Sequence, residues 1–169
     1  MGVLRPIGDL IKRVREDNRK KRERDDRRPL DDQASLETCL HQHSKDVLQA
    51  VARRLGMAGV SGLRKAELVD AVAAHLRSAQ NLEQAVADLP EHSRTTLNYV
   101  LEQGGVASWE EFSRQYGNDR EESPYWQWVE PQTTMGLLRA CGLLYAGTAS
   151  GEQRVLIPAE LRALLRVTR

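Results

Sequence analysis

The chain has 169 residues, which predicts one domain or two small ones and excludes the large enzyme folds. Its 25 Lys and Arg residues nearly balance 24 Asp and Glu residues, so the formal net charge of +1 gives no field that would draw the whole molecule onto nucleic acid or an anionic membrane. Any electrostatic function must therefore be local.

Apolar runs in the chain are short, so we expect no transmembrane span and no secretory signal. Two cysteines, Cys39 and Cys141, lie far apart and belong to no CxxC pair, which is typical of a reducing compartment. We therefore predict a cytoplasmic protein.

Residues 1–28 are the most basic part of the chain, with 11 basic and six acidic side chains. The apolar residues of the first half recur at helical spacing: Val3, Ile7, Leu10 and Val14. This spacing predicts a helix with an apolar stripe that begins near Pro6. From Arg15 to Arg28 every side chain is polar or charged, so we expect a solvated helix or a disordered arm, and then a linker up to residue 34.

The apolar stripe has no obvious partner within the sequence. We hypothesise that it docks on another protein or on the chain's own core, while the basic arm contacts nucleic acid. Binding to a membrane surface is a minor alternative because the stripe is so short, and we expect no membrane partner.

Residues 35–80 predict two helices joined by an extended loop. Ser44 is placed to cap the first helix, and Gly56 stands where a left-handed C-terminal cap is expected. After the loop at residues 57–62, a second helix begins near Leu63. Its aliphatic residues share one face: Leu68, Val69, Val72 and Leu76.

Residues 81–169 predict five further helices and one β-hairpin. The helices start near residues 81, 90, 108, 133 and 158, and the strands cover residues 143–146 and 154–157. The connection from Gly117 to Pro131 is long enough to hold a local element of its own. Residues 81–130 carry three basic and ten acidic side chains, so this segment would repel a polyanion.

The run from Leu55 to Val69, LGMAGVSGLRKAELV, resembles the helix, extended loop, helix modules of the SAP and Rho N-terminal families. The match covers residues 36–78 and is closest to the Rho terminator version. The resemblance implies a nucleic-acid-binding module whose second helix points its N-terminus at a phosphate, with Arg64 and Lys65 beside it. Three residues of the first helix would extend this contact: Lys45, Arg53 and Arg54. Such modules also occur as protein-docking units.

Residues 89–166 have the order helix, helix, helix, two-stranded wing, helix, which resembles a winged-helix domain, as in bacterial helicase-related proteins. In that resemblance the helix from Thr133 to Cys141 is the recognition helix. With the wing, it would offer these contacts: Gln132, Thr133, Thr134, Arg139 and Arg154. Because the helix holds a single basic residue and its supporting helices are acidic, we favour protein docking over base reading for this half.

Tyr125, Trp126 and Trp128 concentrate aromatic area in a chain with 5% aromatic residues. Base stacking is one interpretation. Since the flanking residues are acidic, we favour an anchor for the long connection or a partner-binding hot spot.

The sequence offers little for metal binding or catalysis. Cys39, His41 and His43 lie at one-residue gaps, which on a helix direct side chains away from one another, so we predict no metal and no cofactor. The chain holds no phosphate-cradling GxxxxGKS/T, no GxGxxG, no HExxH and no nucleophile elbow. We therefore predict that the protein is not an enzyme and has no small-molecule substrate.

The predicted fold is mainly α, with an N-terminal arm at residues 1–34, a SAP or Rho-N-like module at 35–80, and a winged helix with one small β-hairpin at 81–169. The predicted function is non-catalytic association with a DNA or RNA backbone, coupled to docking of a protein partner, in transcription or DNA maintenance. The alternative is an interaction adaptor without nucleic-acid affinity.

Overall fold

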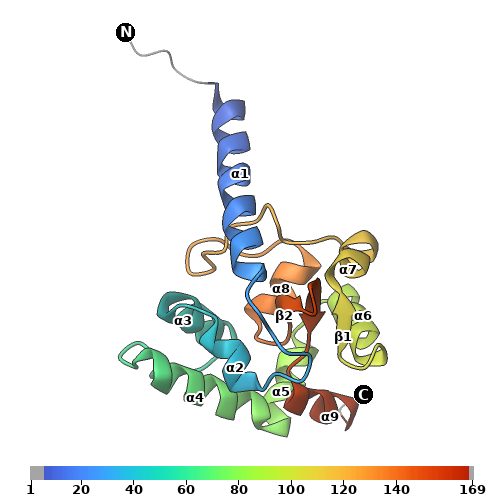
Figure 1. The fold of residues 1–169 in the computed structure, drawn as a ribbon. Helices are drawn as coiled ribbons and strands as arrows, with labels where there is room; N and C mark the ends of the chain where they lie inside the picture. The colour runs from blue at the N-terminus through green and yellow to red at the C-terminus, as the bar shows by residue number, and fades with distance from the viewer. Residues whose placement is uncertain (1–5, 168–169) are drawn as a thin grey trace.

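A computed structural model describes residues 6–167 of the chain (Figure 1). Within this range the fold is mainly helical, with nine helices and a small three-stranded antiparallel sheet. The elements are α1 (Ile7–Asp26), α2 (Leu36–His41), α3 (Lys45–Arg54), α4 (Lys65–Arg77), α5 (Ala79–Ala87), α6 (Glu91–Glu102), β1 (Val106–Ser108), α7 (Trp109–Tyr116), α8 (Thr134–Ala140), β2 (Tyr145–Ala149), β3 (Glu152–Leu156) and α9 (Ala159–Val167). The prediction of a mainly α chain is confirmed.

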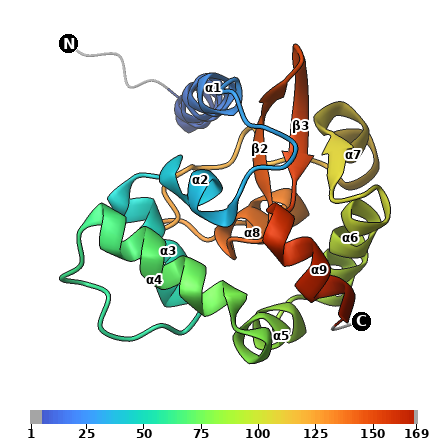
Figure 2. The same ribbon diagram turned by 60° about the horizontal axis from the view of Figure 1, so that its bottom comes forward.

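One hydrophobic core runs through the molecule from residue 30 to residue 165. Helix α4 packs on α2, α3, α5 and α9 (Figure 2), and α3 packs on α8. The segments 35–80 and 81–167 therefore contribute apolar side chains to one shared core. The apolar faces predicted for these helices are the buried ones, as the fully buried Leu48, Leu68, Leu97 and Phe112 show.

The sheet has the strand order β1-β3-β2. Strands β2 and β3 pair up to Ala149 and Glu152, so they are longer at the turn end than predicted and only Ser150 and Gly151 form the turn. Both residues have positive φ, which is the backbone geometry that fits a two-residue hairpin to the strand twist. The third strand, β1, pairs with β3 from Val106 to Ser108 and was missed because three residues carry no readable alternation.

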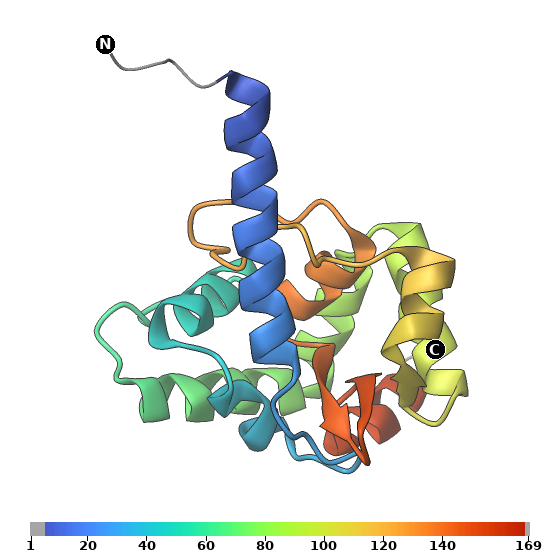
Figure 3. The same cartoon turned by 45° about the horizontal axis from the view of Figure 1, so that its top comes forward.

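Helix α1 is a single helix whose first half projects from the body of the protein (Figures 1 and 3). Its apolar residues Ile7, Leu10 and Val14 are exposed, at 77%, 60% and 50%. Its second half, by contrast, packs on the 117–131 segment, with Arg22 and Asp26 buried. The helix continues to Asp26, so the disordered-arm alternative is wrong. The solvated-helix alternative holds for the exposed Arg15, Glu16 and Asp17, but not for the end of α1, where Arg22 and Asp26 form buried ion pairs.

In the described part of the chain, no helix combines the length and the apolarity needed to cross a bilayer. Val3, predicted as part of the stripe, lies outside the described residues.

Candidate nucleic-acid interface

The start of α4 is positioned by the turn that ends α3. Gly56 has φ +77°, and the amide of Met57 donates to the carbonyl of Ala52 over 3.0 Å, a left-handed helix end that favours glycine. The loop then runs on to Arg64, the N-cap of α4. Burial of Leu68 and the other aliphatic residues on its face fixes the orientation of this helix.

Arg64 and Lys65 are both exposed at the start of α4. Lys65 Nζ donates to the carbonyl oxygen of His41 over 2.9 Å, and Glu67 accepts a hydrogen bond from the Arg64 amide over 3.2 Å. Neither cation forms an ion pair with a carboxylate of residues 6–167. We call Arg64 and Lys65 at the start of α4 the α4 corner. Their two side chains keep positive charges without an ion-pair partner beside the positive end of a 13-residue helix.

The three basic residues predicted on α3 differ in what they contact. Lys45 and Arg53 are exposed and form no ion pair among the described residues. Arg54 instead pairs with Glu130, which ties the end of the 117–131 segment to α3. Arg54 therefore holds the fold together, while Lys45 and Arg53 remain accessible.

Helix α8 is largely covered, contrary to the role of a recognition helix. Thr133 caps it by accepting a hydrogen bond from the Gly136 amide over 3.1 Å, and Thr134 is half-buried behind it. Helix α8 packs against α3 and α6, and its residues from Thr134 to Ala140 are buried or half-buried. The prediction that Thr133 and Thr134 present themselves to DNA is not supported by this placement.

Arg139 and Arg154 are also used inside the fold. The Arg139 guanidinium is buried, so the prediction that it contacts a phosphate is wrong. Arg154 on β3 is half-buried and lies 3.4 Å from the Glu152 carboxylate. Gln132 is exposed, unlike the other four residues predicted as nucleic-acid contacts of this half.

Four buried charges join α1, the 117–131 segment and α8. Arg139 donates from both Nη atoms to Asp26, at 3.0 and 3.4 Å, and its Nη1 also lies 3.0 Å from Asp119. Arg22 Nη1 lies 3.3 Å from the same Asp119 oxygen. Burial by itself would lower the pKa of Arg139, but the attraction of the Asp119 and Asp26 carboxylates is larger, so the net effect is a raised pKa. This network of Arg22, Asp26, Asp119 and Arg139 is neutral as a whole, which is how it tolerates burial.

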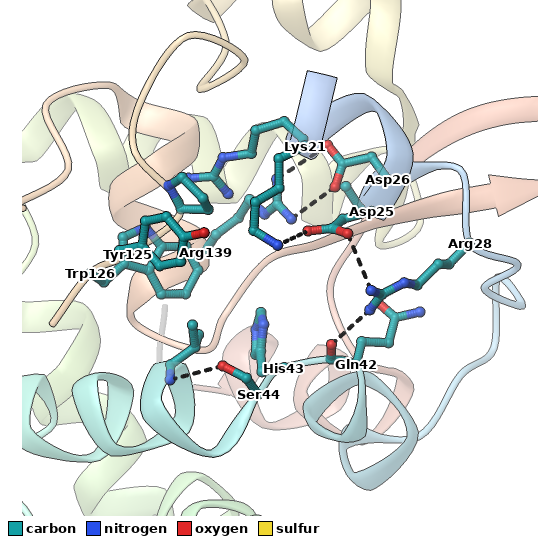
Figure 4. Close-up of a pocket in the computed structure, with 14 residues that line it drawn as sticks. Lys21, Asp25, Asp26, Arg28, Gln42, His43, Ser44, Tyr125, Trp126 and Arg139 are labelled. Atoms are coloured by element: carbon teal, nitrogen blue, oxygen red, sulfur yellow. Dashed lines mark hydrogen bonds and ion pairs between the residues drawn. The ribbon is translucent and has the colours of Figure 1, made fainter. Parts of the chain in front are cut away.

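A polar pocket of about 140 Å³ lies next to this network (Figure 4). His43 points up into it from the turn between α2 and α3. Burial, and then the positive charges of Arg139, Arg22, Lys65 and Arg28, lower the pKa of His43 to about 3. The imidazole is therefore neutral, and the surroundings of the pocket are positive.

Two residues of the basic arm that was hypothesised to contact nucleic acid, Lys21 and Arg28, line this pocket. The sequence did show them as part of the basic run, yet it gave no sign that this run packs against the turn at residues 41–44. Arg28 Nη1 donates to the carbonyl of Gln42 over 2.9 Å. The positive surface at α4 thus extends onto the end of α1.

The three clustered aromatic residues separate in the structure. Trp126 is buried, with its ring centroid 5.5 Å from that of His43, so for this residue the predicted anchor of the long connection is confirmed and the partner-binding alternative is wrong. Tyr125 is half-exposed and Trp128 is 82% exposed. No helix or strand forms between Gly117 and Pro131. Turns and ion pairs to α1 and α3 hold this segment instead.

Within residues 6–167 no group of three or more His, Cys, Asp or Glu side chains lies close enough to hold a metal ion. Cys39 is fully buried and His41 exposed, so the two point apart. Comparison with protein-family models, curated proteins and solved structures found no significant match.

Proposed function

We propose that this protein binds the phosphate backbone of a nucleic acid, without catalysis, and couples that binding to docking of a protein partner. The observation that carries the proposal is the exposed N-terminus of α4, where the side chains of Arg64 and Lys65 form no ion pair with a carboxylate of the described chain. Helix N-termini with flanking cations are suited to phosphate oxygens. Lys45 and Arg53 are exposed cations of α3, the helix that packs on α4.

The fold that we propose for each half of the chain supports separate parts for phosphate binding and for protein docking. Helices α3 and α4 and the loop between them have the helix, extended loop, helix order expected of a SAP or Rho-N-like module, and the short helix α2, which was not predicted, precedes them. The order α6, β1, α7, α8, β2, β3 is that of a winged helix, with β1 as the strand between its first two helices. Because α8 is covered, we assign the winged-helix part to structure and protein docking, and the phosphate contacts to α4.

Charge reversal at the α4 corner tests the proposal. We expect Arg64→Glu combined with Lys65→Glu to weaken binding of labelled DNA and RNA oligonucleotides. The slope of log affinity against log salt should become shallower by about 0.7 to 0.9 for each phosphate that the variant no longer binds. The matched control is Arg114→Glu with Arg166→Glu, which changes the net charge equally at exposed positions on α7 and α9. Equally weakened binding in both variants would contradict a local site.

An adaptor without nucleic-acid affinity is the second candidate. The exposed stripe of Ile7, Leu10 and Val14 on the projecting half of α1 favours it, because such a stripe on a helix is typical of a protein-docking face. An adaptor would show no salt-dependent binding to any oligonucleotide.

A further inference from the structure

A line of contacts connects the α4 corner to the end of α1. Lys65 and Arg28 donate to the carbonyl oxygens of His41 and Gln42, which are adjacent in the chain, each over 2.9 Å. The two cations therefore lie next to each other at the end of α2.

The same line continues from Arg28 to exposed aromatic rings. The Asp25 carboxylate lies 3.2 Å from a nitrogen of Lys21 and 3.2 Å from a nitrogen of Arg28 (Figure 4). Lys21 Nζ is 5.9 Å from the centroid of the Tyr125 ring, and the Tyr125 carbonyl accepts a hydrogen bond from the Trp128 amide over 3.0 Å. We define the cation–aromatic track as the following residues: Lys65, Arg28, Lys21, Tyr125 and Trp128. One carboxylate, Asp25, forms ion pairs with two of its three cations, so positive charge is in excess.

Carboxylates that flank the aromatic residues would repel a polyanion if they were free. Two of the three form ion pairs with arginine, and the third accepts a hydrogen bond from a neutral hydroxyl. The carboxylates are Glu121, Glu122 and Glu130. Their partners are, in the same order, Arg19, Thr133 and Arg54. The two ion pairs offset the charges of Glu121 and Glu130, whereas Glu122 keeps its negative charge, so a nucleic-acid contact at Trp128 meets one uncompensated carboxylate rather than three.

The Trp128 side chain is 82% exposed, and its amide is hydrogen-bonded to Tyr125, whose ring lies 5.9 Å from Lys21 Nζ. Unpaired bases stack on such rings whatever their sequence, and cations alongside hold the backbone. We propose that the cation–aromatic track binds single-stranded nucleic acid, with phosphates at Lys65 and Arg28 and a base stacked on Trp128. This inference rests on the proposed function and names its substrate class. In a duplex the base faces are already covered, so Trp128 would add nothing there.

The test compares Trp128→Ala with wild type on a single-stranded oligonucleotide and on the duplex of the same sequence, as DNA and as RNA. We expect Trp128→Ala to lower single-strand affinity about tenfold or more and to leave duplex affinity within about twofold. The exposed neighbour Val129 offers a matched control, Val129→Ala, which should change neither. Far-ultraviolet circular dichroism establishes that both variants are folded.

Fluorescence gives an independent readout of stacking. The other two tryptophans are shielded, since Trp126 is buried and Trp109 lies under the Arg120 guanidinium at 3.9 Å. Single-stranded oligonucleotide should therefore quench wild-type tryptophan emission. Trp128→Phe should retain affinity for the single strand because an aromatic ring remains for stacking. Binding should no longer quench the tryptophan emission of this variant.

The outcomes separate the two proposals. If Trp128→Ala leaves single-strand affinity unchanged while reversal of Arg64 and Lys65 abolishes binding, the backbone site stands and the track is overturned. Equal reductions of affinity for single strand and duplex would also overturn it. If no oligonucleotide binds, the proposed function fails as well, and Trp128 belongs to a protein contact.

Discussion

Asp119 is the charged side chain whose removal should cost the most stability. Its carboxylate is shared by Arg22 and Arg139, at 3.3 and 3.0 Å, and all three side chains are at most 8% exposed. Asp119→Asn keeps the shape but leaves two buried guanidinium charges against one carboxylate. Breaking a buried pair in this way costs about 3–5 kcal/mol. A domain of this kind is stable by about 5–15 kcal/mol, so this cost is a large fraction of the total.

Urea denaturation followed by circular dichroism measures this cost. The control is Glu121→Gln, which breaks an ion pair with Arg19 whose two side chains are about half exposed and which should cost less than about 1 kcal/mol. Adding Arg22→Met to Asp119→Asn restores the charge balance and should recover part of the stability. If Asp119→Asn costs no more than Glu121→Gln, the docking of α1 does not depend on these charges and the reasoning is refuted.

Two further predictions concern the turn at residue 43 and the sheet edge. Because the unfolded chain protonates His43 near pH 6.5 and the folded chain only near pH 3, the unfolded state binds more protons in between, and stability is lost as the pH falls through this window. The contribution of His43 to this decrease should be about 2 kcal/mol between pH 7.5 and pH 5. Urea curves at the two pH values should show this component missing in His43→Phe; an identical pH dependence in both proteins would contradict it. At Gly147, an added Cβ would collide with the Leu30 side chain and lie 3.1 Å from the Arg28 carbonyl, so Gly147→Ala should destabilise the protein by about 1–3 kcal/mol in a thermal melt. Gly62→Ala, which meets nothing within 4 Å, is its control, and equal melting temperatures would refute the packing argument.

Local signals in the sequence predicted most of the helices. Ser44 accepts a hydrogen bond from the Val47 amide as a helix cap over 3.3 Å, and Gly56 has the positive φ expected after α3. These features depend on neighbours a few residues apart, which the sequence displays directly. The buried faces followed from apolar spacing for the same reason.

Contacts between distant charges could not be predicted in this way. Arg22 and Asp119 lie in two polar segments that each look solvated, and nothing in the spacing of charges indicates which of them will meet. For the same reason the sequence did not show that α3 and α6 pack on α8. Nor did it show the partner of Glu130, whose charge in the sequence argued against a nucleic-acid contact near Trp128.

The most direct test of backbone binding is the affinity of the intact wild-type chain for one single-stranded oligonucleotide across a salt series. Contact with at least two phosphates at the start of α4 predicts that log affinity falls against log salt with a slope of about −1.4 or steeper. An affinity that does not change with salt, or no binding at the lowest salt, would contradict a phosphate site at Arg64 and Lys65.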